Sequence, residues 1–152
     1  MINLIVATHG EMSKYVVELS KMVLGDYEML DFVTFLPGEG TDDLVKKYKE
    51  IFEKNNNLHG YLFLVDIFGG SPYNAASIIS AENENMDIIT GVNVPMLLEL
   101  LDARESTDNL KELVDIAIEA GKSQIKSFKE ILNSSKTEIN NNEDDFDDLG
   151  EL

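Results

Sequence analysis

The fold is decided at residues 61–72, which read YLFLVDIFGGSP. The first five of these residues are apolar without a break, which is typical of a strand buried on both faces of a sheet. Asp66 follows this strand directly, and the glycines and proline beyond it indicate a turn into a helix. Residues 2–7 form a second, largely apolar run, and His9 follows closely. Two predicted strands therefore end next to side chains that can carry chemistry.

The rest of the chain alternates apolar runs with segments of helical period. Two more strands are predicted at residues 29–36 and 86–90. Apolar residues at three- and four-residue steps predict helices at about residues 12–24, 44–52, 72–79, 95–101 and 110–132. Met12 and Met22 are assigned to the buried stripe of the first helix, and Ser71 to the N-cap of the third.

This alternation predicts one α/β domain. Its sheet is doubly wound and mainly parallel, with strand order 2-1-3-4 and helices on both faces. In this order the strands that lead to His9 and Asp66 are neighbours. Ligands of such sheets bind beyond the carboxyl ends of the strands, where the strand order reverses, so we expect His9 and Asp66 to meet there.

Composition limits the classes of partner and cofactor. The chain has 152 residues, enough for one hydrophobic core, and a net charge of −17, which repels nucleic acids and anionic lipids. It contains no cysteine, which excludes disulfides and thiolate ligands and fits a reducing cytoplasm. No secretory leader, membrane-spanning run or glycine-rich nucleotide motif is evident. We therefore expect a cytoplasmic domain with no nucleic-acid partner, metal or other cofactor.

His9 and Asp66 together indicate nucleophilic chemistry on a phosphoryl group. A carboxylate of Asp66 that accepts a hydrogen bond from Nδ1 of His9 fixes the tautomer and leaves the Nε2 lone pair free to attack phosphorus. Gly69 and Gly70 allow the backbone to approach the site. Amides at the start of the helix that follows favour the phosphoryl oxygens.

Two hydroxyl side chains at the same strand ends, Ser71 and Thr8, are assigned to the phosphate as well. Each feature has an ordinary explanation by itself, because a serine here also suits a helix cap and a Gly-Gly-Ser-Pro run is commonly only a turn. The second histidine, His59, has no acidic or histidine neighbour at metal-ligand spacing and is interpreted as a surface loop residue. The chemical interpretation therefore depends on the combination with His9 and Asp66.

Four blocks of sequence, each at a predicted strand end, resemble the enzyme IIA component of the mannose/fructose/sorbose family of the bacterial sugar phosphotransferase system. The blocks are Thr8-His9-Gly10, Pro37-Gly38-Glu39, Leu62–Asp66 with Gly69-Gly70-Ser71-Pro72 and Asn74–Ser77, and Gly91–Leu97. The likeness covers about residues 1–132. It implies the same doubly wound sheet.

The resemblance implies a phosphotransferase that acts as a phosphohistidine relay in the uptake of a mannose-type sugar. The histidine matching His9 accepts a phosphoryl group from HPr and passes it to a IIB component, which serves a membrane IIC/IID complex. The aspartate matching Asp66 pairs with that histidine, and the Gly69-Gly70-Ser71 loop lies against the phosphate. A homodimer with an exchanged antiparallel edge strand is implied too, and Lys136–Ile139 is the segment of this chain that suits the strand.

The resemblance also divides the chain. Residues 1–135 are expected to form the IIA domain, and residues 136–152 an acidic, disordered tail. Since no linker or further domain follows, IIB is expected to be a separate polypeptide.

Two other functions stay open at this point. One is the phosphoryl-donor subunit of dihydroxyacetone kinase, which shares the fold and a histidine at the same strand end. The other is a receiver domain, which would be phosphorylated on Asp66. A receiver needs acidic residues after its first strand to hold magnesium, and this chain has Thr8-His9 there.

Overall fold

The sheet has the predicted topology. The computed structural model describes residues 1–55 and 59–134, and Met1–Lys122 form a compact unit. Within the described residues, four parallel strands form a sheet in the order β2-β1-β3-β4, which confirms the predicted order. The strands are β1 (Asn3–His9), β2 (Leu30–Phe35), β3 (Tyr61–Val65) and β4 (Met86–Thr90). Lys136–Ile139 lies outside the described residues.

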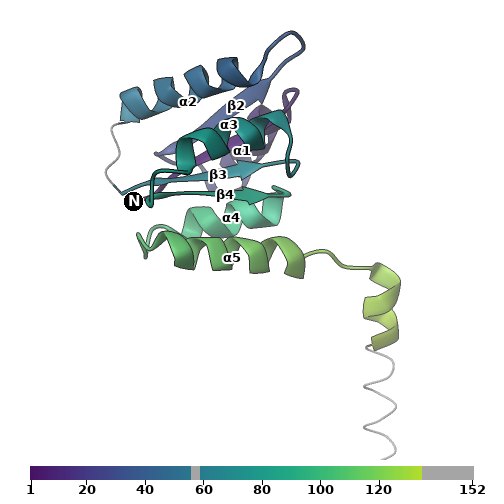
Figure 1. Ribbon diagram of the computed structural model, residues 1–152. Helices are drawn as coiled ribbons and strands as arrows, with labels where there is room; N and C mark the ends of the chain where they lie inside the picture. The colour runs from purple at the N-terminus through teal and green to yellow at the C-terminus, as the bar shows by residue number, and fades with distance from the viewer. Residues whose placement is uncertain (56–58, 135–152) are drawn as a thin grey trace, which may run out of the picture. The chain divides into compact units, whose positions relative to one another are not determined.

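Helices cover both faces of the sheet (Figure 1). One face carries α1 (Met12–Leu24), α4 (Val94–Ala103) and α5 (Leu110–Ser123), and the other carries α2 (Thr41–Asn55) and α3 (Ser71–Ser80). The central strands β1 and β3 contribute alternate side chains to the two resulting cores, which explains why they are apolar along almost their whole length. Among the helices of the described ranges, none has the length and apolar character needed to cross a bilayer.

The first helix buries a different face from the predicted one. Met12 and Met22 are 43% and 80% exposed, so their assignment to the core was wrong. The residues that α1 buries also follow the helical period, and they are Ser13, Val16, Val17 and Ser20. Both serine hydroxyls donate to backbone carbonyls, at 2.9 and 2.8 Å. Because these hydroxyls are satisfied, they cost little to bury, and their small size lets the helix lie close to the sheet.

The long helix predicted over residues 110–132 is interrupted. α5 ends at Ser123, and residues 128–134 form a separate helical segment. The apolar residues keep one period across the interruption, so the pattern alone cannot reveal it. Residues 124–127 between the two segments are not helical.

The sequence pattern predicted Ser71 as the N-cap of α3. This prediction was wrong, because the N-cap is Gly70. Gly70 has extended backbone angles (φ −71°, ψ 168°), and its carbonyl accepts the N–H of Asn74 at 2.9 Å. The helix makes no side-chain cap hydrogen bond. The Ser71 hydroxyl therefore has no capping role.

Arg104 holds the amino-terminal ends of β1 and β2, opposite the strand ends that carry His9. Its side chain is 2% exposed and donates to the carbonyl oxygens of Ile2 (3.3 Å), Met29 (2.6 Å) and Glu28 (2.6 Å). Burial lowers the pKa of the guanidinium. Met29 has a φ of 54°, which is uncommon for a residue with a side chain, so the bonds from Arg104 stabilise a strained turn before β2.

We expect Arg104→Lys to lower the free energy of unfolding by about 3 kcal/mol, because one ammonium cannot replace a planar fork that donates to three carbonyls. Urea denaturation followed by circular dichroism measures the change. Lys111→Met removes a cation from the exposed Lys111–Asp115 pair and is the matched control, for which little change is expected. Equal stabilities of Arg104→Lys and the unmodified protein would contradict this structural role.

Candidate functional site

His9 lies at the carboxyl end of β1, the strand between β2 and β3. Its Nδ1 is 2.9 Å from Oδ2 and 3.2 Å from Oδ1 of Asp66. Because a carboxylate only accepts hydrogen bonds, this contact places the proton on Nδ1 and leaves the lone pair on Nε2. The imidazole is 39% exposed, whereas the Asp66 side chain is 14% exposed. The arrangement offers a nucleophilic nitrogen at the surface with its orienting group beneath it.

The Asp66 carboxylate is itself held by the backbone. Its Oδ2 also accepts the backbone N–H of His9 at 2.9 Å, and its Oδ1 accepts the N–H of Ile67 at 2.9 Å. β1 and β3 are in parallel register up to the pair Ala7 and Val65, so Asp66 follows the last paired residue of β3 directly and His9 lies two residues beyond Ala7 at the end of β1. Strand pairing therefore sets the distance between the two side chains.

The remaining sides of the imidazole are bounded by β2 and by the loop after β3. The ring of Phe35 contacts that of His9 edge to face, with centroids 5.5 Å apart. A Cβ placed on Gly70 would lie 2.7 Å from Cε1 and 3.4 Å from Nε2 of His9, which shows how closely this backbone approaches the imidazole. Gly69 has a φ of 74°, a conformation that favours glycine. Both glycines are thus required by local geometry.

The two predicted hydroxyl residues occupy different environments. Ser71 is the first residue of α3 and is partly exposed. Thr8 is fully buried, and its Oγ1 accepts the backbone N–H of Ser13 at 2.7 Å, which holds the start of α1. His59 is exposed, as predicted, and its Nδ1 lies 3.3 Å from Asp108.

The Pro37-Gly38-Glu39 block has a structural role in the loop after β2. The Glu39 carboxylate accepts the N–H of Leu36 at 2.7 Å and pairs with Lys47 at 2.6 Å, and these contacts lower the pKa of Glu39. Lys47 Nζ also donates to the carbonyl of Thr34 at 2.8 Å. These bonds hold the carboxyl end of β2, where Phe35 contacts His9.

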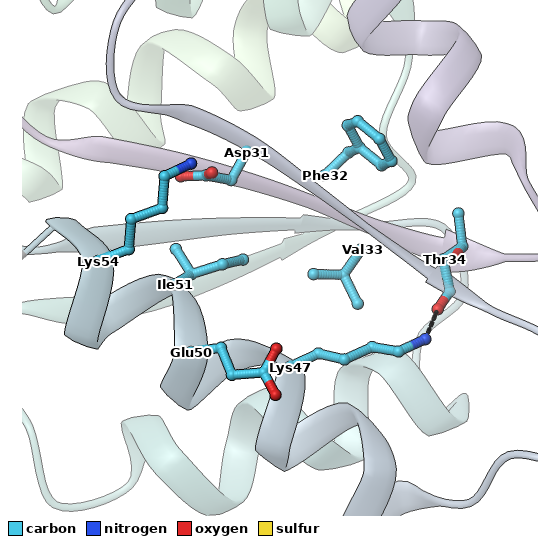
Figure 2. A pocket seen from close by; sticks show the side chains of 8 residues that line it. All are labelled: Asp31, Phe32, Val33, Thr34, Lys47, Glu50, Ile51 and Lys54. Carbon is cyan, nitrogen blue, oxygen red and sulfur yellow. Dashed lines mark hydrogen bonds between the residues drawn. The ribbon is translucent and has the colours of Figure 1, made fainter.

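A pocket of about 350 Å³ lies between β2 and α2, away from the predicted site residues (Figure 2). Side chains of both charges line it, and the lining residues are Asp31, Phe32, Val33, Thr34, Lys47, Glu50, Ile51 and Lys54. A second pocket, of about 380 Å³, is lined by residues of the β4 and α5 regions. Within the described ranges, no three histidine, aspartate or glutamate residues gather closely enough to hold a metal ion.

Two neighbours of the site, Phe35 and Asn74, were not among the site residues predicted from the sequence. Phe35 could have been found from the strand order alone, because it ends the strand that pairs with β1. Asn74 donates from Nδ2 to the carbonyl of Gly69 at 3.0 Å. Its position one turn into α3 gave no chemical signal, since asparagine is common near helix starts.

Comparisons with known proteins agree on one family. A sequence model described as "PTS system fructose IIA component" matches residues 3–118. The PTS system fructose-specific EIIA component of Bacillus subtilis is 44% identical over 115 residues, which cover 76% of this chain and 78% of that protein. The PTS system mannose-specific EIIAB component of Escherichia coli K12 is 40% identical over 128 residues, or 84% of this chain. This chain spans only 40% of that relative's length.

Solved structures share the fold. The PTS IIA protein associated with the fucose utilization operon of Streptococcus pneumoniae matches with a TM-score of 0.73 and 26% identity, covering 86% of this chain and 95% of that one. The phosphotransferase system component EIIA of Streptococcus agalactiae matches with a TM-score of 0.77 and 24% identity, covering 85% and 98%.

We expect Gly70→Ala to displace the His9 imidazole from Asp66, because the added methyl group would lie 2.7 Å from Cε1. Nitrogen-15 NMR of the imidazole measures the change at Nδ1 and Nε2. Gly40→Ala is the matched control, since the nearest atom to its Cβ is 3.9 Å away. Imidazole signals identical in Gly70→Ala and the unmodified protein would show that the loop yields instead of the ring.

Proposed function

Because the chain belongs to the family of PTS system fructose IIA components, which are phosphotransferase carriers of sugar transport, we propose that it is a phosphohistidine relay. In this proposal His9 accepts a phosphoryl group from HPr and passes it to a IIB component. The observation that carries the proposal is the bond between Nδ1 of His9 and Asp66, which leaves Nε2 free at the surface.

The proposed transfer is an in-line exchange between two imidazoles. The Nε2 lone pair of His9 attacks phosphorus on the donor, an N–P bond forms, and the donor nitrogen takes back its electron pair as the old N–P bond breaks. The ring of His9 gains positive charge in this step. Asp66 stabilises that charge through Nδ1, and transfer to IIB is the same exchange in the opposite sense.

Backbone groups of α3 are the proposed holders of the phosphoryl oxygens. A helix N-terminus carries partial positive charge and free N–H groups, which favour phosphate. α3 starts at Ser71, next to the glycine that lies against His9. Gly69, Gly70 and Ser71 therefore form the proposed phosphate loop. Thr8 is fully buried, and its proposed contribution is to hold the start of α1 by accepting the N–H of Ser13.

Exposed apolar side chains near the strand end that carries His9 favour binding to another protein. Met12, Leu36, Ile67 and Phe68 follow the carboxyl ends of three adjacent strands, and Phe68 is 74% exposed. A partner that covers these residues would exclude water from the transferred phosphoryl group. Because the chain carries a net charge of −17, partners with basic rims, HPr and IIB, would associate faster at low salt.

Further parts of the proposal follow from the resemblance. They are a mannose-type sugar, an indirect link to a membrane IIC/IID complex, a cytoplasmic location, a homodimer, and an acidic tail at residues 136–152 that the IIA domain does not require. Sedimentation of the full chain and of a chain ending at residue 135 measures the oligomeric state and the role of the tail.

We expect the chain to take up one phosphoryl group when it is incubated with phosphoenolpyruvate, enzyme I and HPr. A phosphoramidate on His9 is lost in acid and survives base, whereas an acyl phosphate on Asp66 would be cleaved by base and by hydroxylamine. His9→Ala should abolish uptake, and the matched variant His59→Ala should retain it. Label that persists in His9→Ala, or that hydroxylamine releases from the unmodified protein, would overturn the relay in favour of a receiver.

We expect Asp66→Asn to slow phosphorylation by about ten- to a hundredfold, because the amide keeps the shape of the carboxylate but loses its charge and one of its two acceptor oxygens. Rapid-quench measurement of phosphoryl transfer from HPr gives the rate. Asp102→Asn, an exposed position on α4, is the control. An unchanged rate in Asp66→Asn would remove Asp66 from the mechanism.

A further inference from the structure

We infer that Asn74 is a positioning residue that fixes the phosphate loop beside Nε2 of His9. The inference rests on the proposed phosphoryl transfer. The loop must lie close to the His9 imidazole, yet its two glycines give it little rigidity of its own. Gly70 admits the imidazole because it has no Cβ, and Gly69 adopts a φ of 74°. Two consecutive glycines leave the loop without side chains that resist rotation of its peptide planes.

Asn74 binds both glycine carbonyls from outside the loop. Its Nδ2 donates to the carbonyl of Gly69 at 3.0 Å, and its backbone N–H donates to the carbonyl of Gly70 at 2.9 Å. The N–H of Gly70 donates in turn to the carbonyl of Ile67 at 3.2 Å, which closes a turn over the loop. The Asn74 side chain is the contact from α3 that fixes the peptide plane between Gly69 and Gly70.

The orientation of these carbonyls determines where the amides point. A trans peptide is planar, so each N–H lies opposite the carbonyl of the preceding residue. Since the Gly70 carbonyl faces Asn74, the N–H of Ser71 points out of the start of α3. Gly70 approaches Nε2 of His9 most closely among the loop glycines, because its Cβ position is 3.4 Å from that atom. The backbone N–H of Asn74 fixes the peptide plane that carries the Ser71 N–H. The side chain of Asn74 fixes the preceding plane, whose N–H is donated to Ile67, and so keeps Gly70 and the start of α3 in place beside Nε2 of His9.

A purely structural role would have a different signature. Asn74 is exposed, and its side chain makes one hydrogen bond to a surface loop, so its loss should have little effect on the free energy of unfolding. Peptide rotation at Gly69 would instead disturb the phosphate loop in the transition state. The predicted effect is on kcat of phosphoryl transfer, with KM for the donor unchanged.

The test compares Asn74→Ala and Asn74→Asp with the matched control Ser77→Ala, which removes a hydroxyl that donates to Tyr73 on the same helix. With phosphorylated HPr as donor, we expect kcat to fall about five- to tenfold in both Asn74 variants, with unchanged KM and melting temperature. The aspartate cannot donate to Gly69, yet its charge near a helix N-terminus favours the helix, which separates activity from stability. Amide NMR should show increased motion at Gly69, Gly70 and Ser71.

The possible failures are distinguishable. If the unmodified protein takes no phosphoryl group from HPr, the proposed function fails. If it is active and Asn74→Ala has the same kcat, Asn74 has no positioning role. A loss in Asn74→Asp alone would assign the effect to charge repulsion and would equally overturn the inference, as would a loss of the same size in Ser77→Ala.

Discussion

The Asp66 carboxylate accepts two hydrogen bonds from one residue, His9, through its backbone N–H and its Nδ1. This double contact requires that the ends of β1 and β3 lie side by side, which the parallel pairing of these two strands provides. A third bond, from the N–H of Ile67, prevents the carboxylate from turning away. The tautomer of the imidazole, and with it the availability of Nε2, thus depends on strand pairing and not on the histidine alone.

The two ends of the sheet are built on different principles. At the amino-terminal ends of the strands a buried arginine donates from its terminal nitrogens to three carbonyls. At the carboxyl edge polar groups are held but not covered, since His9 is partly exposed and apolar side chains surround it. Rigidity is therefore concentrated beneath the site. An exposed upper surface suits the proposed transfer of a group between proteins more than a reaction that encloses a small substrate.

Because the backbone at Gly70 lies close to the His9 imidazole, the loop that carries it needs support from elsewhere in the structure. A glycine at position 70 is required by the ring, and the turn that delivers it needs a second glycine at position 69. Such a loop has little intrinsic order. The side chain of Asn74 and the first turn of α3 supply that order from outside, in the same way as Glu39 and Lys47 hold the loop after β2.

The sequence by itself determined the strands, their order and the meeting of His9 with Asp66, because uninterrupted apolar runs and right-handed crossovers leave few topologies open. It also indicated the glycine loop and the family. It failed where the outcome depended on which surface a helix meets. Ser13 and Ser20 face the sheet in place of Met12 and Met22, since hydroxyls that find carbonyl partners can be buried. The end of α5, the cap at Gly70 and the contact from Asn74 were likewise decided by the tertiary structure. The last two are hydrogen bonds between residues four and five positions apart, which a pattern of apolar residues does not encode.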